Sequence, residues 1–137
     1  MNNSKWIDQY GTTIEETEIF EKIYVPEFAD TVYLRTRARY EWNPCSQENW
    51  ARAWVTNSEG LPVKVPLLTV RMYGWIDEGN RTIEKSVKDF WFVEMHHKEP
   101  CGGPLPCMCV RPDQVCSQGI IVWNRNRRTE TRWACAG

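Results

Sequence analysis

Hydrophobic and polar residues alternate along most of this chain, with a period of two. In residues 31–42, TVYLRTRARYEW, one alternating set of side chains consists of Val32, Leu34, Thr36, Ala38, Tyr40 and Trp42. The set between them consists of Tyr33, Arg35, Arg37, Arg39 and Glu41. A strand separates two such sets onto opposite faces, whereas a helix mixes them. The pattern therefore predicts a long antiparallel strand with one face on the core and a row of arginines on the other.

The same period predicts further strands. Together with the first, they are residues 16–25, 31–42, 48–56, 61–76, 81–97, 119–123 and 127–136. A short helix is the alternative for residues 48–56. Turn residues at 77–80 and 124–126 predict two hairpins, and a bulge is expected near Asp89.

Seven to eight strands without a long helix predict a single all-β domain over residues 1–137. Strands separated by Pro and Gly turns are typical of an antiparallel β-sandwich, immunoglobulin-like or jelly-roll-like, or of a closed barrel. Residues 31–42 also resemble the Tyr-containing strand of fibronectin type III domains, and this resemblance implies a strand and no function. We expect residues 1–15 to form an amino-terminal arm and residues 98–119 a long loop rich in Cys, Gly and Pro.

Composition agrees with a folded domain, because 42% of the 137 residues are hydrophobic and 26% are charged. The net charge of −1 is unevenly distributed: residues 1–30 carry −5 and residues 111–137 carry +3. Such ends can meet within one chain or between neighbouring copies. Nucleic acid is not an expected partner, because the acidic half would repel it. The sequence has neither a signal-peptide pattern nor an apolar run of about 20 residues, so no membrane contact is expected.

Six cysteines are the strongest candidates for special chemistry, and four of them fall in residues 101–116, CGGPLPCMCVRPDQVC. The six are Cys45, Cys101, Cys107, Cys109, Cys116 and Cys135. Their even number and the Gly- and Pro-rich loop favour disulfides. The alternatives are ordinary buried thiols, or a zinc site that also uses His96 or His97. Adjacent residues of a strand point to opposite faces, so at most one of these histidines could bind the ion.

No pattern typical of an enzyme is present, since the chain has no nucleophile elbow, phosphate-binding loop or paired-carboxylate motif. We therefore expect a non-enzymatic protein without catalytic residues, and zinc is the only cofactor considered.

Arginine and aromatic residues provide candidate interface positions, because Arg, Trp and Tyr concentrate at binding hot spots. The candidates are Tyr33, Arg35, Arg37, Arg39, Trp123, Arg127, Arg128 and Trp133. Arg52 and Arg71 are expected to join the first row from neighbouring strands. Protein subunits of the same assembly, in a homo-oligomer or a hetero-assembly, are the expected partners, and a glycan is the alternative.

The leading hypothesis is a structural or interaction subunit of a larger assembly, such as a capsid-decoration, neck or tail protein of a phage virion. A virion or extracellular location follows from this hypothesis. The alternatives are a carbohydrate-binding or adhesin-type β-sandwich module and a small zinc-stabilised β domain.

Overall fold

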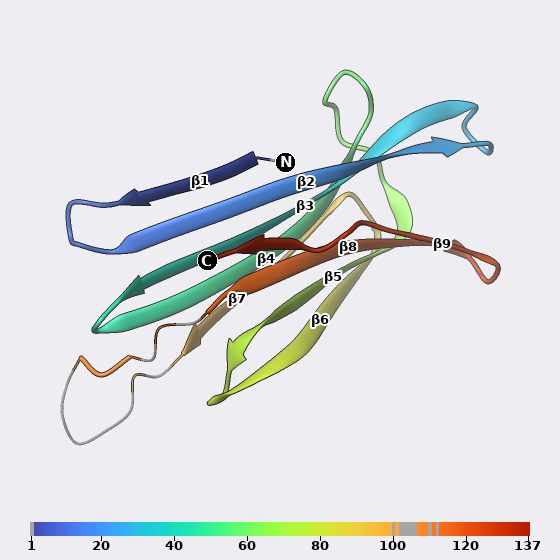
Figure 1. The fold of residues 1–137 in the computed structure, drawn as a ribbon. Helices are drawn as coiled ribbons and strands as arrows, with labels where there is room; N and C mark the ends of the chain where they lie inside the picture. The colour runs from blue at the N-terminus through green and yellow to red at the C-terminus, as the bar shows by residue number, and fades with distance from the viewer. Residues whose placement is uncertain (1, 100, 102–106, 110, 112) are drawn as a thin grey trace.

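The computed structural model describes residues 2–99, 101, 107–109, 111 and 113–137, and these residues form ten strands and no helix (Figure 1). The strands are β1 (Asn2–Ile7), β2 (Thr13–Val25), β3 (Asp30–Asn43), β4 (Ser46–Thr56), β5 (Val65–Ile76), β6 (Gly79–Phe90), β7 (Phe92–Glu99), β8 (Val115–Asn124), β9 (Arg127–Glu130) and β10 (Ala134–Ala136). None of the described residues belongs to a helix that is long and apolar enough to cross a membrane.

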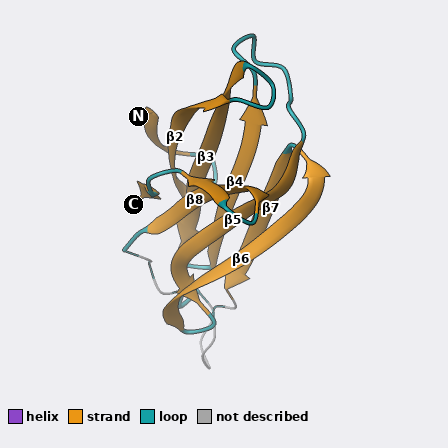
Figure 2. Ribbon diagram, turned by 90° about the vertical axis from the view of Figure 1, so that its right-hand side faces the viewer, coloured by secondary structure: helices purple, strands orange, loops and turns teal. Residues whose placement is uncertain are grey.

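Two antiparallel sheets pack together and form the expected β-sandwich (Figure 2). Sheet A has the strand order β1-β2-β3-β4-β7. Sheet B has the order β10-β8-β5-β6, and β9 also pairs with β8. Residues 31–42 lie in β3, at the centre of sheet A, where both neighbours cover the polar backbone. The short helix considered for residues 48–56 is wrong, because they belong to β4.

The ten strands exceed the expected seven to eight for three reasons. The amino-terminal arm contains β1, which pairs with β2. The long strand expected at residues 81–97 is interrupted at Trp91, so that β6 joins sheet B and β7 joins sheet A. The region 127–136 forms two short strands, β9 and β10, in place of one. The bulge expected near Asp89 coincides with a left-handed backbone, since φ of Asp89 is 50°.

The core lies between the sheets and follows the period-two pattern. On β3 the buried side chains are Val32, Leu34, Thr36, Ala38 and Tyr40, as expected. Leu68, Val70 and Met72 of β5 belong to the same buried cluster. Hydrogen bonds join the sheets here: Thr36 Oγ1 and Ser117 Oγ lie 2.7 Å apart, and Ser117 Oγ lies 3.4 Å from the backbone oxygen of Arg52. Alternation on β3 therefore leaves its arginines on the outer face of sheet A.

All six cysteines form disulfides, which confirms the favoured interpretation. The pairs are Cys45–Cys107, Cys101–Cys109 and Cys116–Cys135. The interpretation as ordinary buried thiols is therefore wrong, and a zinc site built on these thiolates is not formed. Three disulfides indicate an oxidising environment. The cysteine-rich loop is shorter than expected, because β7 extends to Glu99 and β8 begins at Val115.

The acidic and basic ends of the sequence meet within one chain. Arg127 of β9 lies 2.6 Å from the carboxylate of Glu27, in the turn between β2 and β3. The hydrogen bond from Arg127 is the main reason why the pKa of Glu27 lies below its ordinary value. Arg132 lies 2.7 Å from the carboxylate of Glu21 on β2. These contacts account for part of the charge asymmetry without a second copy of the chain.

Candidate functional site

The outer face of sheet A carries arginines and aromatic rings in register across its strands. We call this surface the arginine–aromatic face and define it by three rows of directly paired residues. The first row is Asn2, Glu18, Arg37, Arg52 and Glu94. The second is Ser4, Glu16, Arg39, Trp50 and His96. The third is Phe20, Arg35, Trp54 and Phe92.

Carboxylates on neighbouring strands hold three of these arginines. Arg37 Nη2 lies 2.9 Å from the carboxylate of Glu18. Arg39 Nη1 lies 3.1 Å from that of Glu16, and Arg39 also pairs with Glu41. Arg52 Nη2 lies 2.7 Å from that of Glu94. Acidic and basic groups therefore lie side by side across the strands, and the face has no strong excess of either charge.

Aromatic rings also contact the arginine side chains and restrict their movement. The guanidinium of Arg39 lies 5.7 Å from the ring of Trp6 and 5.6 Å from that of Trp50. Those of Arg37 and Arg52 lie 5.7 Å and 5.9 Å from the single ring of Trp54. Guanidinium groups within about 6 Å of a ring centre are in the range of favourable cation–π contact. The result is an ordered surface on which long side chains have lost much of their freedom.

A hollow of about 210 Å³ opens on this face, lined by Arg37, Arg39, Trp50 and Arg52. Guanidinium groups offer several N–H donors in a fixed plane, and the indole ring offers an apolar surface. Arg35 lies beside the hollow in the third row and bonds the Thr56 hydroxyl at 3.2 Å. The face can therefore receive carboxylate or carbonyl oxygens together with an apolar group.

The two adjacent histidines lie on opposite faces of β7, as expected. His96 stacks on Trp50 with ring centres 4.3 Å apart, and its Nε2 lies 3.0 Å from the Glu48 carboxylate. His97 points to the interior, where its Nε2 lies 2.6 Å from Glu99 Oε2. Burial raises the pKa of Glu99, but hydrogen bonds from His97 and from two backbone amides outweigh burial, so that this pKa lies below its ordinary value.

Only some of the expected interface residues belong to the arginine–aromatic face. Tyr33 lies beside it, with its ring 5.4 Å from the guanidinium of Arg35. Arg52 joins the row as expected, but the expectation for Arg71 is wrong, because Arg71 lies on sheet B and pairs with Glu84 at 3.1 Å. The remaining candidates lie outside the face: Trp123, Arg127 and Arg128 at the β8–β9 hairpin, and Trp133 before β10. Arg127 lies 5.0 Å from the ring of Trp123, and Arg128 lies 3.4 Å from the Glu130 carboxylate.

The pairing register of β3 with β4 places Trp50 and Trp54 beside the arginines, and the sequence pattern does not predict this register. Both residues were in a predicted strand, but their face relative to Arg37 depends on the pairing of β3 with β4. The signal in the sequence is their spacing with Arg52, because residues 50, 52 and 54 share one face of a strand.

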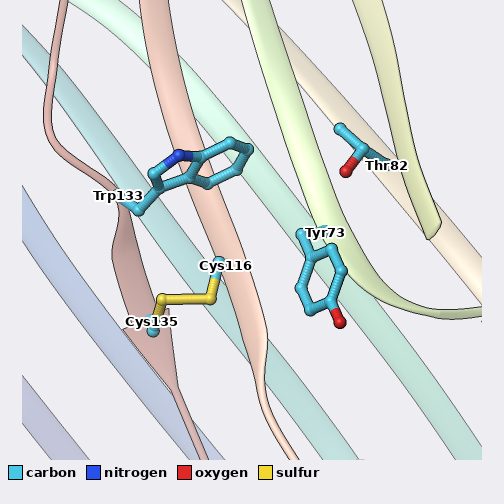
Figure 3. A pocket seen from close by; sticks show the side chains of 5 residues that line it. All are labelled: Tyr73, Thr82, Cys116, Trp133 and Cys135. Carbon is cyan, nitrogen blue, oxygen red and sulfur yellow. A yellow bond between two sulfur atoms is a disulfide. The ribbon is translucent and has the colours of Figure 1, made fainter. Parts of the chain in front are cut away.

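A second surface feature lies on sheet B, where a groove of about 410 Å³ runs over the Cys116–Cys135 disulfide. Figure 3 shows the ring of Trp133 on one side of the groove and Tyr73 and Thr82 on the other. Its lining is mostly apolar. The spacing of Trp133 and Cys135 places both on one face of an extended chain, but the contribution of Tyr73 and Thr82 requires the sheet register.

Comparison of the chain with protein-family models, with curated proteins and with solved structures finds no match. The functional interpretation therefore depends on the geometry alone.

Proposed function

We propose that this chain is a non-enzymatic interaction subunit that binds a neighbouring protein through the arginine–aromatic face. The observation that carries the proposal is the ordering of Arg37, Arg39 and Arg52 between aromatic rings and carboxylates on a wide sheet. Ordered arginine and tryptophan side chains lose little entropy when a partner binds, and they are typical of binding hot spots.

Charge balance favours a protein partner over a simple polyanion. Arg37, Arg39 and Arg52 each pair with a glutamate, so a sulfated glycan or nucleic acid would meet carboxylates beside every one of them. A protein surface can offer acidic, basic and apolar groups in a complementary arrangement. Arg35 bonds a hydroxyl and has no carboxylate partner among the described residues, which leaves it available to an acidic group of the partner.

The assembly that we propose is a virion, in which this chain would serve as a capsid-decoration, neck or tail protein. The three disulfides support a location outside a reducing cytosol, such as a virion or the extracellular space. Contact with copies of the same chain is the simplest form of this proposal.

Native mass spectrometry of the oxidised chain tests the proposal. We expect oligomers in the wild-type chain and in Arg71→Glu, and we expect Arg35→Glu to be monomeric. Arg71 is the matched control, because it is an arginine of similar exposure on the other sheet. A wild-type chain that stays monomeric and binds no purified particle component would contradict the proposal, as would equal oligomerisation of both variants.

A carbohydrate-binding module is the second candidate, and the groove of Figure 3 is the observation that favours it. Trp133 is 41% exposed beside this groove, and an exposed indole can stack on a sugar ring. Binding to a glycan array that is lost in Trp133→Ala but kept in Arg35→Glu would support this candidate over the first.

A further inference from the structure

Three potential metal ligands meet at the end of the sandwich where β5 turns into β6. They are Asp77 in this turn and His97 and Glu99 on β7, and their ligand atoms all lie within 4.8 Å of one another. Glu99 is buried, His97 is partly buried and Asp77 is exposed. The cluster therefore extends from the interior to the surface, which gives an ion a path from solvent.

The backbone holds the cluster in place. Glu99 Oε2 accepts the backbone N–H of Asp77 at 2.9 Å, and Glu99 Oε1 accepts that of Glu78 at 2.8 Å. Asp77 and Glu78 both have left-handed φ values, 53° and 65°, as a two-residue hairpin turn requires. A side chain of sheet A thus fixes a turn of sheet B and keeps Asp77 close to His97.

Buried amide groups beside the cluster provide an independent observation. Gln47 and Asn49 lie on the inner face of β4, directly opposite Glu99 and His97, and they are 1% and 0% exposed. Both amide atoms of Gln47, and Oδ1 of Asn49, lack a hydrogen-bond partner among the described residues. Buried amides without partners are costly, and directly opposed side chains are close enough to share one ligand.

We propose that Asp77, His97 and Glu99 bind one divalent transition-metal ion, for which Zn²⁺ is the best fit, with an amide oxygen of Gln47 or Asn49 beside it. An imidazole nitrogen with carboxylate oxygens is a common ligand set for Zn²⁺, whereas Ca²⁺ and Mg²⁺ prefer oxygen ligands alone. The ion would connect β7 of sheet A to the β5–β6 turn of sheet B. This site uses no cysteine, because all six form disulfides, and it is independent of the arginine–aromatic face.

Calorimetric titration of the oxidised, chelator-treated full chain with ZnCl₂ tests the site. We expect saturable binding of one ion per chain. His97→Gln should weaken the affinity at least tenfold, and His96→Gln should change it less than twofold. His96 is a matched control because it is the adjacent histidine on the opposite face of the same strand. No saturable binding in the wild type, or equal weakening by both variants, would overturn the proposal.

A second variant keeps the test decisive if His97→Gln fails to fold. Asp77→Asn changes an exposed turn residue whose backbone N–H bonds Glu99. Zn²⁺ should raise the midpoint of thermal unfolding of the wild type and of His96→Gln, and the rise should be much smaller in Asp77→Asn. Circular dichroism without metal would show that the variant is folded. An equal rise in Asp77→Asn, or a rise with Ca²⁺ as large as with Zn²⁺, would contradict a transition-metal site of this composition.

Discussion

Arg37 of β3 and Arg52 of β4 lie directly opposite each other, so that two like charges occupy neighbouring positions of sheet A. Such a pair is destabilising when it stands alone. Here Glu18 and Glu94 flank the pair on the adjoining strands, and both guanidinium groups contact the ring of Trp54. The order of charges along the row, negative, positive, positive, negative, compensates the repulsion and fixes both arginines.

Replacement of Glu94 by Gln should leave the repulsion between Arg37 and Arg52 partly uncompensated and lower the stability of the protein. Both side chains of the Arg52–Glu94 pair are about one-third exposed, so we expect a loss of about 0.5–1 kcal/mol in the free energy of unfolding at low salt. The loss should shrink at about 0.5 M NaCl, because salt screens exposed charges. Urea denaturation at both salt concentrations measures it. Glu84→Gln is the control, since its partner Arg71 lies opposite Gln118 on β8. A loss that is independent of salt, or equal in the control, would contradict this explanation.

Thr36→Val should remove a buried hydrogen bond between the two sheets, from Thr36 of β3 to Ser117 of β8. Thr36 Oγ1 donates to the backbone oxygen of Arg52 at 2.8 Å and lies 2.7 Å from Ser117 Oγ, and both hydroxyl-bearing residues are fully buried. Valine has nearly the same shape, so we expect a loss of about 1–2 kcal/mol from the unpaired groups. In Thr36→Val/Ser117→Ala the two effects should be less than additive, because the substitutions remove the same bond. Additive losses in urea denaturation would show that this hydrogen bond is not important.

The fold follows largely from local alternation, and the exceptions have a common cause. β3 and β4 show strict alternation, because one face contacts the core and the other contacts solvent. β1 shows none, since all six of its residues are exposed and it is held by pairing with the edge of β2. The alternation of hydrophobic and polar residues also does not predict the break at Trp91 between β6 and β7. Which sheet a strand joins depends on contacts with residues far away in the sequence.

The same limit applies to the arginine–aromatic face. Arg35, Arg37 and Arg39 share one strand, so their common face could be predicted from their spacing. The prediction for Arg71 is wrong, because a period of two identifies a face of a strand but not the sheet to which the strand belongs. Trp50 could be placed only with the register of β3 and β4. The interface role of all these residues remains a prediction.

Gly119→Ala should disturb a tight contact between the two sheets. A Cβ atom at this position would lie 3.2 Å from both Leu34 Cδ1 and Ala53 Cβ, and 3.4 Å from the backbone oxygen of Arg35. We expect a loss of about 1–3 kcal/mol, since a packed core cannot absorb a methyl group without strain. In Gly79→Ala the added Cβ would lie 3.5 Å from the end of the flexible Arg81 side chain, so this control should change stability by less than about 0.5 kcal/mol. Equal effects in thermal unfolding would argue against a tight contact at Gly119.

The three disulfides should differ in their contributions to stability according to the length of chain they close. Cys45–Cys107 spans 62 residues, Cys116–Cys135 spans 19 and Cys101–Cys109 spans 8. Loop-closure entropy predicts losses of about 4, 3 and 2.5 kcal/mol when each pair is replaced by two alanines. Urea denaturation of the three double variants measures the order, and alkylation of the denatured, unreduced wild type checks that no thiol is free. The greatest loss on removal of Cys101–Cys109 would contradict the entropic explanation, because that pair constrains the unfolded chain least.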